Sequence, residues 1–174
     1  MIRAFALVIA INEVWFFTYS SSRLSSLQYC HAPLYGCLKD ADRMCSFLKR
    51  KYGSSLILKV LKDSEATKDE ILKALKEHFL NNNQISRGDA MIIYFAGHGS
   101  QIQIQTQKIE VLCPFDYDHT KDVTGIKDID FRRRLEELAE TKGDNIVEIL
   151  FMLILSTHAF LDGYPRLLSL RGSD

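Results

Sequence analysis

The sequence predicts an α/β protein in which a mostly parallel sheet carries helices on both faces. Short, almost wholly apolar runs recur along the chain, as strands buried on both faces of a sheet require. Segments with helical periodicity separate these runs, and this alternation is typical of parallel sheets. The chain has 174 residues, of which 47% are hydrophobic and 25% charged, so we expect one folded domain with a substantial core.

Four apolar runs are the expected strands. They are Phe5–Ile11 (FALVIAI), Leu56–Leu61 (LILKVL), Ala90–Phe95 (AMIIYF) and Asn145–Leu155 (NIVEILFMLIL). The second run alternates slightly between apolar and polar residues, so we expect it near an edge of the sheet. Asn12 and Glu13 interrupt the apolar start, which favours a buried strand over a secretory signal. All four runs are shorter than the roughly 20 residues that cross a bilayer.

Three helices are expected between these strands. Apolar residues recur at helical spacing from Cys37 to Tyr52, and Gly53 is a typical helix end. The second helix, Thr67–Asn81, opens with the capping box TKDE. The third, Asp128–Thr141, ends before Gly143. The stretch Ser20–Ser26 (SSSRLSS) is expected to be a loop.

Charge and cysteine content exclude several classes of function. Twenty-two basic residues balance twenty-two acidic ones, so no net field attracts the chain to nucleic acid or to an anionic membrane. The basic runs Lys49–Lys51 and Arg132–Arg134 lie in helical segments and are interpreted as solvated faces. The four cysteines show neither a C-x-x-C pair nor the spacing of a zinc module. We therefore expect reduced thiols in a cytoplasmic protein.

A histidine between two glycines, His98 in the stretch YFAGHGSQ, lies in a turn, Gly97–Ser100, that we expect after the third strand. Ligand sites of such sheets lie beyond the carboxyl ends of the strands, and flanking glycines let a histidine approach a substrate closely. Most such tripeptides are ordinary turns, so the motif alone is weak evidence. A nucleotide site is not expected, because a third glycine and a Walker lysine are both missing.

Six stretches carry a resemblance to a known family. In chain order they are YGCLKDADRM, ILKVLKDSEATKDEILKAL, GDAMIIYFAGHGSQ, EVLCPFDYD, GIKDIDFRRRLEEL and KGDNI. Their order and spacing resemble the caspase-like domain of fungal metacaspases. The resemblance implies a three-layer sandwich with six strands when complete, of which the last strands are missing here. Residues 1–174 are then one partial domain, with the match strongest at 35–146 and a divergent tail at 147–174.

The resemblance also implies a cysteine endopeptidase with a histidine–cysteine dyad that cleaves peptides or proteins after arginine or lysine. His98 matches the dyad histidine, and Gly99 matches the residue whose backbone N–H helps to bind the oxyanion. Such a donor lowers the barrier by roughly 3 kcal/mol. Asp40 matches an acidic residue that faces the basic side chain of the substrate. On the residues alone, Asp40 reads equally well as an acid stabilising a helix N-terminus.

The dyad cysteine is missing from its expected place. Counting on from KGDNI without a gap places Leu153 at the nucleophile, and no cysteine follows Cys113. Cys37 is the one stand-in thiol, because it opens a helix at the same edge of the sheet as His98; its plainer interpretation is a small core residue. We therefore expect no peptide hydrolysis. The alternative is a pseudoenzyme or regulatory binding domain that associates with a related peptidase.

Calcium, which some metacaspases require, is not expected to bind. The stretch QIQIQTQKIE after His98 offers no acid before Glu110, although Asp128 and Asp130 lie roughly where two later ligands would be. Ala96 replaces a serine of the family's pocket for the basic side chain. We expect neither a metal nor another cofactor.

Overall fold

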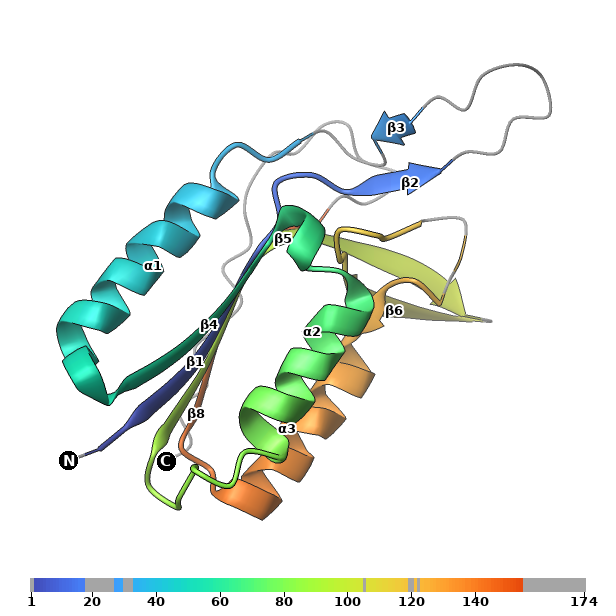
Figure 1. Cartoon of the computed structure of the whole chain (residues 1–174). Helices are drawn as coiled ribbons and strands as arrows, with labels where there is room; N and C mark the ends of the chain where they lie inside the picture. The colour runs from blue at the N-terminus through green and yellow to red at the C-terminus, as the bar shows by residue number, and fades with distance from the viewer. Residues whose placement is uncertain are drawn as a thin grey trace, which may run out of the picture.

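The computed structural model describes residues 2–17, 27–29, 33–104, 106–118, 121 and 123–154 (Figure 1). In these residues a six-stranded sheet has the order β4-β1-β5-β6-β7, with β8 also paired to β5. Its strands are β1 (Ala4–Ala10), β4 (Leu56–Lys62), β5 (Ala90–Ile104), β6 (Gln107–Leu112), β7 (Ile126–Lys127) and β8 (Ile146–Ile154). A separate antiparallel pair comprises β2 (Trp15–Phe17) and β3 (Leu27–Tyr29). The expected loop at 20–26, Cys30 and the tail from 155 lie outside the described residues.

The four predicted strands form the parallel part of the sheet. β1 pairs with β4 on one side and with the first half of β5 on the other. β8 pairs in parallel with β5 along its opposite edge. Within the described residues β4 is an edge strand, as its partial alternation predicts. The predicted mostly parallel sheet is therefore confirmed, and β5 is its centre.

Helices cover both faces of this sheet (Figure 1). Helix α1 (Cys37–Tyr52) lies on one face, whereas α2 (Lys68–Ala74) and α3 (Asp128–Lys142) lie on the other. Short helical turns, η1 (Gly53–Ser55) and η2 (Asp63–Glu65), precede and follow β4. This arrangement confirms the predicted three-layer sandwich.

The alternation of side chains along β1 fits these two layers. Towards α1 the strand presents small residues: Ala4, Ala6, Val8 and Ala10. Towards α2 and α3 it presents larger ones: Phe5, Leu7 and Ile9. All are fully or almost fully buried. Each large side chain contributes roughly 1.5–3 kcal/mol on burial, and the small ones allow α1 to pack close to the sheet.

The second predicted helix begins as expected but changes its geometry. Thr67 is the N-cap, and its hydroxyl accepts a hydrogen bond from the backbone N–H of Glu70 at 3.3 Å. After Ala74 the chain continues as a π-helix, η3 (Leu75–Leu80), instead of an α-helix. Such segments are rare, and side-chain periodicity does not distinguish them from α-helix.

The glycine-flanked stretch is strand and not the turn that we expected. β5 runs without interruption from Ala90 to Ile104 and forms an antiparallel hairpin with β6. Gly97 is needed there for close packing: a Cβ on it would lie 3.0 Å from the Phe95 ring. A glycine that serves packing looks the same in sequence as one that serves a turn, and this caused the wrong prediction.

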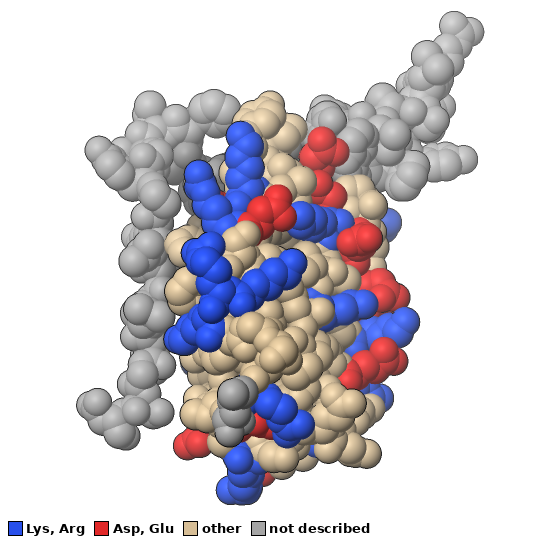
Figure 2. All heavy atoms as spheres, turned by 60° about the vertical axis from the view of Figure 1, so that its left-hand side comes forward, with Lys and Arg blue, Asp and Glu red and all other residues tan. Residues whose placement is uncertain are grey.

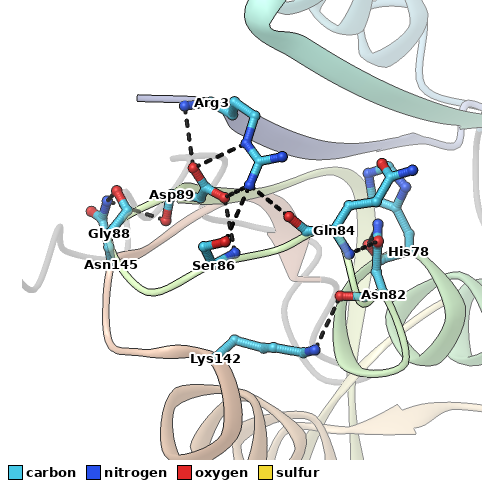
Figure 3. A network of polar contacts seen from close by, with 9 residues as sticks. All are labelled: Arg3, His78, Asn82, Gln84, Ser86, Gly88, Asp89, Lys142 and Asn145. Atoms are coloured by element: carbon cyan, nitrogen blue, oxygen red, sulfur yellow. Dashed lines mark hydrogen bonds and ion pairs between the residues drawn. The ribbon is translucent and has the colours of Figure 1, made fainter. Parts of the chain in front are cut away.

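Polar contacts fix the register of three strands at the amino end of the sheet (Figure 3). The Arg3 guanidinium donates to Asp89 and to the carbonyl of Gln84, both at 2.6 Å. Burial alone would raise the pKa of Asp89, but hydrogen bonds from Arg3 and Ser86 outweigh it and lower that pKa. The Asn145 side chain donates at 3.3 Å to the carbonyls of Gly88 and Asp89. These contacts hold β1, β5 and β8 together before their ladders begin.

Candidate active site

His98 lies in β5 beyond Ala96, the last residue of that strand in register with β1. Its side chain is buried, with 1% of the residue exposed. Its carbonyl accepts a hydrogen bond from the backbone N–H of Cys113 at 3.0 Å, so the chain that follows β6 passes directly beside it. The histidine is thus held between neighbouring strands at the carboxyl end of β1.

Leu153 is opposite His98 in the parallel ladder of β5 and β8. Neighbouring strands in a sheet are about 4.8 Å apart, so the two backbones are adjacent at this point. The next residue, Gly99, is opposite both Ile154 of β8 and Leu112 of β6. The predicted adjacency of positions 98 and 153 is therefore present, and Gly99 lies where three strands meet. The catalytic roles of these residues stay predictions.

Asp40 lies in the first turn of α1 and is exposed. Its carboxylate forms an ion pair with Arg43 at 3.0 Å, and 52% of its side chain is exposed. The role suggested by the resemblance needs a partly buried carboxylate, and this pairing leaves Asp40 nearer to a first-turn acid. The charge of Asp40 nevertheless affects the buried Tyr94. Burial and, to a smaller extent, the negative charge of Asp40 raise the pKa of Tyr94 to about 12.

Cys37, the stand-in thiol, is buried at the start of α1, with 9% of the residue exposed. Burial raises the pKa of this thiol to about 11, and the charge of Asp40 adds to the effect. A reactive cysteine needs its pKa lowered instead. The surroundings of Cys37 therefore favour the inert core residue.

Hydrogen bonds that sequence reasoning missed connect the loops at this end of the sheet. Asp63, which follows β4 with a φ of 40°, accepts from the backbone N–H of Asn12 at 2.7 Å. Asp116, after β6, accepts from the backbone N–H of Lys68 at 2.8 Å. The Lys68 ammonium donates to the carbonyl of Gly125 at 3.0 Å. The acid directly after the second expected strand, Asp63, was the one sequence signal for these contacts.

Asp128 and Asp130, the two acids that the resemblance places roughly at later calcium ligands, lie in the first turn of α3. Asp130 forms an ion pair with Arg133 at 2.9 Å on α3. Calcium takes six to eight oxygen ligands. Within the described part of the chain, no group of three or more His, Cys, Asp or Glu side chains could hold a metal ion.

A mostly parallel sheet between helical layers, with a buried histidine in β5 just beyond the carboxyl end of β1, is consistent with a caspase-like protein. Residues 6–143 match the family model of the metacaspase, peptidase C14 domain, and the chain belongs to this family. No curated protein matches the chain.

Among solved structures, the chain is similar to protein GSU0716 from Geobacter sulfurreducens, with 17% sequence identity and a TM-score of 0.59. The match covers 84% of this chain and 48% of that one, so this chain spans about half the length of the solved protein. At this identity the likeness supports the fold alone.

Proposed function

We propose that this chain is a non-hydrolytic member of the metacaspase family. It keeps the histidine of the peptidase dyad, and a leucine occupies the position of the thiol. The observation that carries this proposal is the ladder position of Leu153, directly opposite His98. A leucine side chain offers neither a nucleophile nor a proton.

The reaction of the family needs both partners. An imidazole favours the thiolate of a neighbouring cysteine, which attacks the peptide carbonyl, and the imidazolium then protonates the leaving amine. The backbone N–H of Gly99 is the proposed oxyanion donor, and Asp40 is the proposed contact for an arginine or lysine of the substrate. Without a thiol, the donor and the substrate contact have no covalent intermediate to stabilise.

Cys37 does not replace the missing thiol. With a pKa of about 11, on the order of one thiol in ten thousand is ionised at pH 7. A histidine could compensate only by direct contact, and the buried start of α1 keeps the thiol inside the core between helix and sheet. This side chain therefore supports packing and not chemistry.

Peptide reporters with arginine or lysine before the cleavage site test the proposal. We expect the purified chain to release no more product than its His98→Ala variant, with calcium and with a chelator. Turnover that disappears in His98→Ala would contradict the proposal. In that case Cys37→Ala shows whether the stand-in thiol is responsible.

A second candidate function is that of a regulatory binding domain that associates with a related caspase-like chain. Exposed apolar side chains on β8 favour it: Val147 is 41% and Phe151 49% exposed. Co-sedimentation of the chain with a metacaspase, compared with its Phe151→Ser variant, tests this candidate.

We also propose a cytoplasmic location for this chain. Within the described residues, none of the helices has the length and apolar character that a membrane crossing requires.

A further inference from the structure

In the part of the chain that the structure describes, one strip of the sheet on the face that bears α1 has exposed apolar side chains. Helix α1 packs over β1, β4 and β5. On β8, Ile149 packs with the core beneath α1, whereas Leu150 and Met152 pack on the other face. Alternation along the strand therefore places Val147 and Phe151 on the face of α1. The Phe151 ring lies 5.7 Å from that of the buried Tyr94, and half of Phe151 remains exposed.

One flank of α1 borders this strip. Asp42 binds Lys62 of β4 at 2.6 Å, so its flank of the helix faces β4. Asp40 is two residues, or about 200° around the helix, from Asp42, so its flank faces away from β4 and towards β5 and β8. Residues four and seven positions after Asp40 share its flank. They are Met44, which is partly buried, and Phe47, which is 48% exposed.

We name this surface the α1–β8 strip and define it by Met44, Phe47, Val147, Ile149 and Phe151. Its five side chains are apolar, and all are exposed or partly exposed. Exposed apolar side chains that gather on one surface mark interaction sites, whereas scattered ones do not.

Cations surround the helix side of the strip. Arg43 and Arg50 are four residues before and three after Phe47, and both are exposed. The Lys51 ammonium lies 5.8 Å from the centre of the Phe47 ring. Figure 2 shows that Lys and Arg side chains gather over the face that bears α1. Asp40 offsets only part of this charge, through its pair with Arg43.

We propose that the α1–β8 strip binds an amphipathic helix of a partner polypeptide, with apolar residues towards β8 and acidic residues towards α1. An open sheet face offers side chains and not backbone groups, so it suits a helix better than an added strand. The cations on α1 complement acidic residues along that helix. A second copy of this chain fits poorly, because a two-fold contact would bring the same cations together.

This proposal rests on the second candidate function and assigns the binding surface of that function to the α1–β8 strip. A direct test uses a labelled peptide of about 18 residues, five helical turns, with leucine on one face and glutamate on the other. A matched peptide has lysine in place of glutamate. We expect fluorescence anisotropy to show at least about tenfold tighter binding of the full chain to the glutamate peptide than to the lysine peptide.

Variants then locate the site. Phe47→Ser and Phe151→Ser should each weaken binding at least about fivefold, whereas Ile129→Ser should leave it unchanged. Ile129 is 64% exposed on α3, across the sheet, and is the matched control. The charge reversal Arg43→Glu with Lys51→Glu should make the lysine peptide the tighter ligand. Circular dichroism identifies any variant that does not fold.

Equal binding of the two peptides, or equal binding by Phe47→Ser and the parent chain, would overturn the proposal. Self-association in sedimentation that is lost in Phe151→Ser would assign the strip to a second copy and overturn it as well. Reporter hydrolysis is measured on the same preparations. If the chain neither binds the helix nor hydrolyses the reporters, only this proposal fails and the non-hydrolytic function stands. If the chain binds the helix and also hydrolyses the reporters, only the non-hydrolytic function fails.

Discussion

His98 and Leu153 are opposite each other in the ladder of β5 and β8. If position 153 is the family's nucleophile position, as proposed, the ladder places that position beside His98. Substitution at either residue tests whether their side chains interact.

A cysteine at position 153 should interact with the imidazole of His98 across the ladder of β5 and β8. We expect the Leu153→Cys thiol to have a pKa below the ordinary value of roughly 8.5, because a neighbouring imidazole favours the thiolate. Iodoacetamide labelling, followed peptide by peptide, should then be faster at this thiol than at the buried Cys45. Full peptidase activity is not expected from this single substitution, because Phe151 and Met152, not polar residues, precede position 153.

The control for this labelling is the double variant Leu153→Cys with His98→Ala. Its thiol should react several-fold more slowly. If both proteins label equally fast, the two side chains do not interact, and Leu153 loses its assignment as the nucleophile position.

Removing the carboxylate of Asp89 should destabilise the fold from the amino end of the sheet. Asp89→Ala removes the carboxylate acceptor of the Arg3 guanidinium, which keeps the Gln84 carbonyl, and of the backbone N–H of Ser86, a loss of about 1–3 kcal/mol. Urea denaturation measures it. The exposed pair of Arg133 and Asp130 is the comparison, and Asp130→Ala should cost at most about 0.5 kcal/mol.

The same carboxylate predicts a dependence on pH. Because the pKa of Asp89 is lowered in the folded state, its stabilisation is complete above the ordinary aspartate pKa of about 3.9 and is lost as pH falls through the folded value. The stability of Asp89→Ala should therefore fall less steeply below pH 4 than that of the parent chain. Parallel curves in this range would contradict the assignment.

His78 should make the fold sensitive to mild acid. Its ring lies between those of Phe5 and Phe79, at 6.3 and 4.9 Å, and its Nε2 has no hydrogen-bond partner in the described part of the chain. Burial lowers the pKa of His78 and outweighs the opposing effect of the backbone at Ala6 and Ile57, while the nearby Lys59 lowers the pKa further. The unfolded chain thus binds the proton more readily, and stability is complete above about pH 6.5 and falls as pH falls through the folded pKa.

Chemical denaturation at pH 7 and pH 5 measures this effect. In His78→Phe the loss of stability between the two pH values should be smaller than in the parent chain. An equal loss in both proteins would place the acid sensitivity elsewhere.

Gly97→Ala should disturb the strand beside His98. The added Cβ would lie 3.0 Å from the Phe95 ring and 3.5 Å from Ile11, so we expect a loss of about 1–3 kcal/mol in unfolding free energy. Phe95→Leu removes part of that ring. In the double variant the alanine should therefore cost less than it does alone, and a double-mutant cycle measures the coupling. Additive losses would mean that the strand moves elsewhere to accommodate the methyl group.

Strong local patterns allowed most of the fold to be predicted from the sequence. The apolar runs gave four strands, and the capping box at Thr67 gave the start of α2 correctly. The second half of β5 was missed together with its hairpin partner β6, although the alternation in Gln101–Ile104 is a strand signal, because Gly97 and Gly99 were read as the end of the strand. The π-helix at Leu75–Leu80 could not be predicted, because its apolar spacing also fits an α-helix.

The site was less predictable, because its chemistry depends on burial. The pairing of β8 with β5 followed from the parallel topology, so the neighbourhood of His98 and Leu153 could be inferred. The raised pKa of Cys37 could not, since a helix N-terminus suggests a lower one and only the packing shows that desolvation wins. The ion pair of Asp40 with Arg43 depends on side-chain conformations that residue spacing permits but does not require.

Asn145, far from His98, helps to fix the register of β8 against β5. Its side chain donates hydrogen bonds to two successive carbonyls just before β5. From Ile146 onward each residue of β8 pairs with a successive residue of β5, so that Leu153 pairs with His98. Adding or deleting a single residue in β8 after Asn145 would shift this pairing by one and turn each later side chain to the opposite face. Insertions early in β8 should therefore alter the surroundings of His98 more severely than many substitutions made beside it.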